Sequence, residues 1–263
     1  MRSAVFFILF SMLSWAAYAQ DNEPQLSKKE KKKQRINELI RQEEEGVNAY
    51  SKHTALGIKL TSDGYGAFIE VGRAQSVKRS LLFQFEFAER KHQKEEKQQV
   101  SGFTTTTPII YGKINFFYPV KLGVQEQILL GNKSNKNGVS VTANGGGGLI
   151  FGLLRPYKAD VLKTSGIRDF VGVDDADSAY FYNEGFYGGP DFSIGWSGLK
   201  LTPGLYIKTS LRFDYARYNE MLNALEVGLM AEAYSRKIPQ MIYLPQKQVF
   251  LGAYVSLIFG RRK

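Results

Sequence analysis

Apolar and polar residues alternate along most of the chain from His53 onward, in segments of about ten residues separated by turn residues. The clearest segment is 205–215, where Leu205, Ile207 and Leu211 share one face and Lys208 and Arg212 share the other. A period of two residues is typical of a β-strand with one apolar face. Nine such runs can be counted, at residues 56–60, 67–72, 83–88, 110–118, 122–131, 139–154, 205–215, 225–233 and 249–259. The pattern therefore predicts an all-β protein.

One face of each run is continuously apolar, while the other carries full charges. In a soluble β-sandwich the apolar faces pack inward against each other. In a transmembrane β-barrel they face lipid, and the charged faces line the interior. Aromatic residues near the strand ends and the final run at the end of the chain favour the second arrangement. We therefore predict an antiparallel transmembrane β-barrel of eight to ten strands over residues 53–263.

The count of nine runs conflicts with this fold, because single-chain outer-membrane barrels normally have an even number of strands. Three explanations remain open. The glycine-rich run at 145–148 is two strands, residues 157–200 contain another strand, or the weak run near Leu122 is miscounted. The four glycines mark either a sharp bend or a place where another element approaches closely.

The faces opposite the apolar ones carry charges of both signs, four cations and five anions. Because an interior of this size is filled by side chains, we expect the charges to form a paired network that closes the lumen rather than a diffusion pore. A proton or catalytic relay is the alternative for such buried charges. The predicted lumen network consists of Lys59, Glu70, Glu86, Lys113, Lys208, Arg212, Asp214, Glu226 and Glu232.

The first nineteen residues have the features of a secretory signal peptide. Arg2 precedes an apolar stretch, and Ala17 and Ala19 form a small-x-small cleavage site before Gln20. Residues 20–52 are highly charged, and Ser27 with Glu30 forms a capping box that predicts a helix over 28–45. We expect this helix to lie in the periplasm as a solvated lead-in or a docking element. Its candidate partner-contact residues are Lys28, Lys29, Lys31, Lys32 and Lys33.

Residues 157–200 are the longest stretch without regular alternation. They hold many aromatic residues and glycines, which suit a folded lid, a lumen plug or a partner-contact surface. We prefer a packed lid over the barrel mouth, and Trp196 is a further candidate for partner contact. Asp174, Asp175 and Asp177 lack the ligand spacing of a calcium-binding loop. Residues 89–107 form a second, mixed-charge loop, which we interpret as solvent-exposed.

Composition narrows the chemistry. The 263 residues include no cysteine and only two histidines, His53 and His92, far apart in sequence. Disulfides and thiolate chemistry are therefore excluded, and histidine-based catalysis and zinc binding are not expected. No phosphate-binding loop or G-x-S-x-G motif occurs. We accordingly expect no catalytic residues, no cofactor and no metal site, and the protein is not expected to be an enzyme.

The net charge of +10 suggests an anionic partner. Because exported proteins rarely meet nucleic acid, the predicted signal peptide argues against nucleic acid as that partner. The phosphates of outer-membrane lipids, including lipopolysaccharide, and acidic protein partners in the envelope fit better. The mean hydropathy of −0.26 is compatible with a membrane barrel, because alternate polar positions dilute its apolar face.

An ordered series of short segments resembles an outer-membrane β-barrel family of Bacteroidota. The segments are YGKIN at 111–115, GNKSNKNGV at 131–139, GGGLIFGLLRPY at 146–157, Gly195 with Trp196, PGLY at 203–206, ALEVG at 224–228 and FGRR at 259–262. The resemblance implies the barrel fold and an outer-membrane location, and association with secretion, gliding or barrel-assembly machinery. One departure is that Phe259 is followed by four further residues, whereas a terminal strand often ends on an aromatic residue.

Together, these features predict an integral outer-membrane β-barrel with a periplasmic N-terminus. We expect it to be a non-catalytic structural or interaction subunit of a cell-envelope complex for secretion or outer-membrane assembly. The competing functions are a narrow transport channel and a barrel enzyme that acts on lipid or peptide.

Overall fold

The computed structural model describes residues 51–99, 107–133, 138–163, 165–173, 186–218 and 220–263. The predicted signal peptide, the helix over 28–45 with its five lysines, and the aspartates at 174, 175 and 177 lie outside these residues. Within the described part of the chain, no helix has the length and apolar character needed to cross a membrane.

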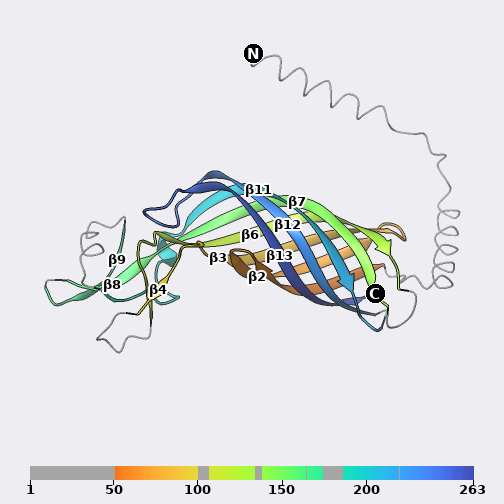
Figure 1. The fold of residues 1–263 in the computed structure, drawn as a ribbon, viewed down its shortest axis with the longest axis horizontal. Coiled ribbons are helices and arrows are strands. Elements are labelled where there is room, and N and C mark those ends of the chain that lie inside the picture. Colours follow the sequence, from red (N-terminus) through yellow and green to blue (C-terminus); the bar gives the residue numbers. More distant parts are fainter. Residues whose placement is uncertain (1–50, 100–106, 134–137, 164, 174–185, 219) are drawn as a thin grey trace, which may run out of the picture. The chain divides into compact units, whose positions relative to one another are not determined.

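Eight long strands form a closed barrel, in which every neighbouring pair is antiparallel (Figure 1). The order around the barrel is β1-β13-β12-β11-β7-β6-β3-β2. The strands are β1 (Lys52–Thr61), β2 (Gly64–Ala74), β3 (Arg79–Arg90), β6 (Asn115–Gly131), β7 (Ser140–Pro156), β11 (Lys200–Asp214), β12 (Met221–Ile238) and β13 (Lys247–Arg262). The predicted all-β antiparallel barrel of eight to ten strands is thus confirmed.

The even strand number arises because one strand, β6, contains both the end of the predicted run 110–118, from Asn115 onward, and the whole predicted run 122–131. Pro119 lies within this strand and had suggested a break. It is accommodated where the pairing of β6 with β3 is interrupted, between Phe87↔Val120 and Arg90↔Phe117. A proline has no N–H to donate to a neighbouring strand, so an interruption there loses little. The glycine-rich run, in contrast, is a single strand, β7.

The barrel is apolar outside, and most of its buried charged strand side chains lie inside. Along β11, Leu205 and Ile207 are 62% and 67% exposed, whereas Lys208 and Arg212 are 5% and 1% exposed. The same alternation runs along β1, β2, β3, β12 and β13. This distribution is the one that transmembrane barrels have, and the inverse of a soluble barrel packed around an apolar core.

The two ends of the barrel differ. At one end, which we call the turn end, β2–β3, β6–β7 and β11–β12 are joined by short segments, and β1 begins beside the end of β13. At the other, the long-loop end, the connections include residues 91–114 and 157–199. The strands that border these long connections are also longer, with 17 residues each in β6 and β7 against 10 in β1.

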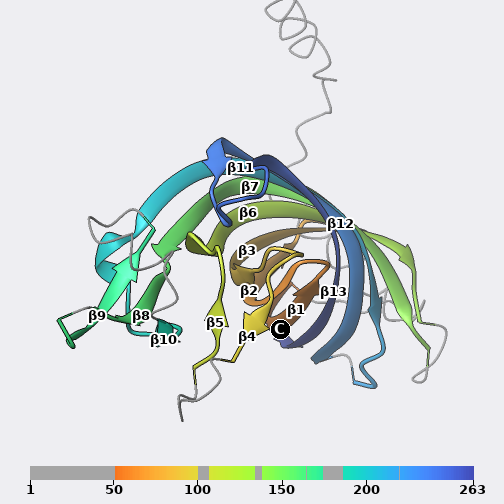
Figure 2. The same ribbon diagram turned by 60° about the vertical axis from the view of Figure 1, so that its left-hand side comes forward.

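Residues 157–200 were predicted to lack regular structure, but part of this segment forms strands. They contain β8 (Lys158–Leu162), β9 (Arg168–Gly172), β10 (Phe186–Gly188) and a short 3-10 helix, η1 (Trp196–Gly198). The three strands form a separate sheet in the order β10-β8-β9 (Figure 2). Strands this short give too few alternations to show in the sequence. Val161 and Val171 pack with Tyr157 and with Ile110 of β5 (Ile109–Ile110), which pairs with β4 (Lys97–Gln98).

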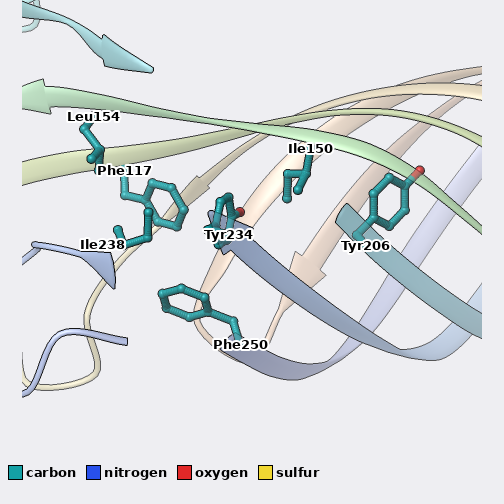
Figure 3. Packing of buried hydrophobic residues seen from close by; sticks show 7 residues of the cluster. All are labelled: Phe117, Ile150, Leu154, Tyr206, Tyr234, Ile238 and Phe250. Atoms are coloured by element: carbon teal, nitrogen blue, oxygen red, sulfur yellow. The ribbon is translucent and has the colours of Figure 1, made fainter. Parts of the chain in front are cut away.

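An apolar cluster fills the barrel interior toward the long-loop end (Figure 3). Its rings meet edge to face, with centroids 5.4 Å apart for Phe117 and Tyr234 and 5.7 Å apart for Tyr234 and Phe250. The cluster consists of Phe117, Ile150, Leu154, Tyr206, Tyr234, Ile238 and Phe250.

Residues 110–115 join the loop between β12 and β13 at this end. Ile114 N donates to the carbonyl oxygen of Gln240, and Ile242 N donates to that of Gly112, both at 2.8 Å. The connection before β6 is therefore held to the far side of the barrel. Residues 157–200 contact this earlier connection, because Tyr157 Oη accepts a hydrogen bond from Ile110 N and Gly189 N donates one to the carbonyl oxygen of Thr107. The lid over the barrel mouth stays a prediction.

Candidate functional site

The inward-facing positions of the strands gather almost all of the predicted lumen charges. The side chains come from β1, β2, β3, β11 and β12, and each is at most 5% exposed. The residues placed there are Lys59, Glu70, Glu86, Lys208, Arg212, Asp214, Glu226 and Glu232. Because a buried charge is costly without a partner, the contacts among them determine what the interior can do.

One group of charges is centred on Lys121 of β6. Its Nζ lies 2.7 Å from Glu86 Oε1 and 2.8 Å from Glu232 Oε1. Lys59 forms an ion pair with the other oxygen of Glu86, and Arg90 Nη1 lies 2.6 Å from Glu232 Oε2. We call these five residues the Lys121 cluster. Since each carboxylate contacts two cations, negative charge in this half of the lumen is compensated directly.

A second group is centred on Arg212 of β11. Its guanidinium donates two hydrogen bonds of 2.8 Å to Glu70, and its Nη2 lies 2.7 Å from Glu226 Oε2. His53 Nε2 lies 3.1 Å from Glu70 Oε1, and Tyr254 Oη donates to Glu226 Oε1 at 2.8 Å. We call these five residues the Arg212 cluster. A planar guanidinium suits two carboxylates, because its five N–H donors are fixed in direction.

An aromatic ring connects the two clusters, and amide groups hold the remaining lumen lysine, Lys208. Lys208 donates a hydrogen bond to Gln84 Oε1, which also accepts one of 3.0 Å from Gln125. Lys59 Nζ lies 4.4 Å from the centre of the Tyr254 ring, a cation–π contact. This cation–π contact therefore links the Lys121 cluster to the Arg212 cluster.

The network reaches the turn end of the barrel at Asp214, the last residue of β11. Arg262 of β13 forms an ion pair with Asp214, and Lys133 Nζ lies 3.6 Å from Asp214 Oδ1. A cavity of about 40 Å³ lies beside them, lined by residues that include His53, Ser80, Gln127, Arg212, Asp214 and Arg262. That volume holds only a few water molecules, because one water requires about 10–15 Å³ of such volume.

Two of the predicted site residues lie outside the lumen network. Lys113 precedes β6 and its Nζ lies 2.6 Å from Glu95 Oε2 in the long connection before that strand. It had been assigned to the lumen because the alternation was extended back to residue 110. Trp196 stacks on Tyr118, with ring centroids 5.7 Å apart, and donates to the carbonyl oxygen of Phe192. It therefore packs against the outside of its own barrel.

Lys121, Arg90 and His53, which belong to the two clusters, were not identified from the sequence as lumen residues. Lys121 lies between the predicted runs 110–118 and 122–131, Arg90 lies in the predicted mixed-charge loop, and His53 precedes the first predicted run. The available signal was the alternation itself. Continuing the β6 pattern across Pro119 puts Lys121 on the same face as Gln125 and Gln127, which are all buried.

The interior is built for pairing charges. In the described part of the chain, no group of three or more histidine, aspartate or glutamate side chains is arranged to hold a metal ion. The four strand carboxylates Glu70, Glu86, Glu226 and Glu232 all accept from cations in the lumen. The chemical consequence is a lumen filled with mutually neutralising side chains.

Comparison with known proteins gives structural likenesses only. No protein-family model matches the chain. No curated protein sequence matches it either. Neisserial surface protein A is 10% identical, with a TM-score of 0.40, and the match covers 81% of this chain and 96% of that one.

Two further solved barrels are similar at comparable levels. Ail, the attachment invasion locus protein of Yersinia pestis, is 8% identical with a TM-score of 0.37, covering 81% of this chain and 99% of that one. The N-terminal β-barrel domain of Pseudomonas aeruginosa OprF is 10% identical with a TM-score of 0.34, covering 80% and 98%. The barrel of the present chain is defined by its own strand pairing.

Proposed function

We propose that this protein is an integral outer-membrane β-barrel with a sealed lumen, which acts as a non-catalytic structural or interaction subunit of the cell envelope. The observation that carries the proposal is the inverted polarity of the barrel. Its outer wall exposes large apolar side chains on every strand, whereas its interior buries two clusters of ion pairs.

The outer wall requires an apolar environment. Side chains such as Leu56, Phe85, Leu205, Leu229 and Leu251 are between 47% and 77% exposed. Water-soluble monomers rarely expose contiguous apolar surfaces of more than a few hundred Å². A closed barrel leaves no strand edge unpaired, so its backbone hydrogen bonds are satisfied within the hydrocarbon region. A bilayer is therefore the solvent that this surface fits.

The orientation follows from the connections. Outer-membrane barrels have short periplasmic turns and longer outer loops. By this rule the turn end, with the start of β1 and the end of β13, faces the periplasm, and the small sheet β10-β8-β9 faces outward. We infer that residues 20–52 lie in the periplasm and that the outer loops meet lipopolysaccharide and other envelope components.

The sealed interior supports an interaction role rather than transport. Charges that neutralise each other through direct contacts leave no row of free charges for a passing solute. The resemblance to Bacteroidota outer-membrane barrels agrees with a place in a secretion or assembly complex, in which protein partners and lipids, not nucleic acid, bind the chain.

Insertion into lipid vesicles tests the membrane assignment. Purified protein is diluted from urea into phospholipid vesicles and examined by gel mobility with and without boiling. We expect a faster-migrating folded band that requires vesicles, and strands that resist protease. Folding into a soluble monomer without lipid or detergent would contradict the proposal.

Purification from envelopes tests the subunit role. Tagged protein is isolated with its neighbours, with and without residues 20–52. A second variant separates the contribution of the positive charge from that of the predicted helix itself, and in it glutamine replaces Lys28, Lys29, Lys31, Lys32 and Lys33. We expect one stable set of envelope proteins that the truncation releases, while the folded gel band persists. An isolated monomer in every preparation would exclude the subunit role.

A further inference from the structure

The outer wall of the barrel carries an apolar hollow. An apolar groove of about 610 Å³ crosses β2, β3, β6 and β7 on the outside. Its lining residues include Ile69, Val71, Phe83, Phe85, Leu122 and Val124. A barrel wall curves outward, so a hollow on its outer surface requires side chains to be missing there.

Glycines of β7 account for the hollow. Gly147 faces outward between Val124 of β6 and Ile207 of β11, and Gly145 is the next outward position. A Cβ atom at Gly147 would lie 2.4 Å from the carbonyl oxygen of Tyr206, so no other residue fits this position without movement of the backbone. The wall here consists of backbone, whereas Leu122 and Leu149 stand as full side chains alongside.

The groove is followed by cations toward the turn end of the barrel. The row with Val71, Phe83, Val124 and Gly147 is succeeded by a row with Arg73 and Glu126, and then by Arg79 beside Ile128. Successive outward rows are about 7 Å apart along a strand. Arg79 Nε lies 3.7 Å from Glu126 Oε1, with both side chains about half exposed. Two arginines and one glutamate leave this border net positive.

We propose that the groove is a binding site for an anionic phospholipid, whose acyl chain lies along Gly147 and whose phosphate contacts Arg73 and Arg79. This inference rests on the proposed membrane location. The turn end faces the periplasm in that orientation, so the lipid belongs to the inner leaflet. Each arginine near an anionic head group contributes about 1 kcal/mol, or about fivefold in affinity.

Shape favours a lipid over a second copy of the chain. In a two-fold dimer the same patch meets itself, so two hollows would face each other across an unfilled space. The same arrangement would bring Arg73 and Arg79 of both copies together. A flexible acyl chain fills a hollow without either difficulty, and its phosphate offsets the arginines.

Two kinds of variant separate the contribution of the apolar groove to lipid binding from that of the arginines. Val124→Trp fills the groove, and Val227→Trp on β12 is its matched control, because the two valines are 42% and 44% exposed on the same outer surface. The double variant Arg73→Gln with Arg79→Gln removes the cations and leaves the groove open. Gel mobility with and without boiling establishes that each variant has folded.

The experiment is native mass spectrometry of protein released from nanodiscs of equal parts phosphatidylglycerol and phosphatidylethanolamine. We expect one retained phosphatidylglycerol on the wild type and on Val227→Trp, at least about fivefold less on Val124→Trp, and a loss of preference of about fivefold or more in the arginine double variant. Equal retention by Val124→Trp and the control, or an unchanged preference in the double variant, would overturn the site. A disulfide-linked dimer of a Val124→Cys variant after mild oxidation would assign the groove to a second copy.

Different results would contradict the proposed membrane location and the proposed lipid site. A wild-type chain that does not enter nanodiscs contradicts the membrane location itself. A chain that enters them, shows the folded gel band and retains no phosphatidylglycerol contradicts only the lipid site. If Val124→Trp does not fold, the arginine double variant decides the question.

Discussion

Arg212 holds two carboxylates of the barrel interior, Glu70 and Glu226, with one guanidinium group. All three side chains are at most 1% exposed. The free-energy cost of removing these charges from water is roughly balanced by their mutual attraction as long as every charge keeps its partner. Loss of one member destabilises the folded barrel, because the remaining buried charges cannot be solvated.

Arg212→Met is therefore expected to lower the free energy of unfolding by about 3–5 kcal/mol, the usual cost of leaving buried charges without their partner. Arg217→Met, in the exposed turn after β11, is the matched control and should change stability little. Urea titration of both variants in vesicles measures the difference. Equal stabilities would show that the Arg212 cluster does not hold the strands together.

Tyr157 gives a prediction outside the barrel strands. Burial raises the pKa of its hydroxyl to about 12, in a site where the hydroxyl also accepts a hydrogen bond from Ile110 N. Between pH 10 and 12 the unfolded side chain is ionised while the folded one is not, so the local packing loses stability as pH rises through this window. The difference in absorbance between the wild type and Tyr157→Phe should therefore show no tyrosinate near pH 10. A normal titration there would contradict the burial of this side chain.

At the scale of the strand, two adjacent glycines of β7 differ in the space around them. A Cβ atom at Gly146 would lie 2.2 Å from the carbonyl oxygen of Val124, whereas at Gly145 no atom lies within 4 Å. Gly146→Ala is expected to destabilise the barrel by about 1–3 kcal/mol, because a backbone must move, and Gly145→Ala should be tolerated. Thermal loss of the folded gel band compares them. Equal behaviour of the two variants would show that β6 and β7 are not packed this closely.

The strands illustrate what alternation can and cannot predict. It places Lys59, Glu86 and Glu226 on inward faces, because a period of two fixes the face of every residue in a strand. It fails at Pro119, where a turn signal lies inside a strand and hides Lys121. It also cannot pair Arg90 with Glu232, which are 142 residues apart, because that contact depends on how the barrel closes.

The whole molecule combines an apolar wall, an ion-paired interior and two unlike ends. The wall suits lipid on all sides, and the interior holds its strands together through ion pairs. We therefore propose that the function lies on the surfaces that remain, namely the loops of the long-loop end, residues 20–52 and the groove on β7. Transport through the barrel would require the Lys121 and Arg212 clusters to open.

Conductance of single barrels in a planar bilayer tests this central claim most directly. Protein that shows the folded gel band is added to the membrane under an applied voltage. We expect insertion without a steady current, and brief openings, if any, to become more frequent in Arg212→Met. A steady open-state current through the wild-type barrel would contradict the sealed lumen and favour a channel.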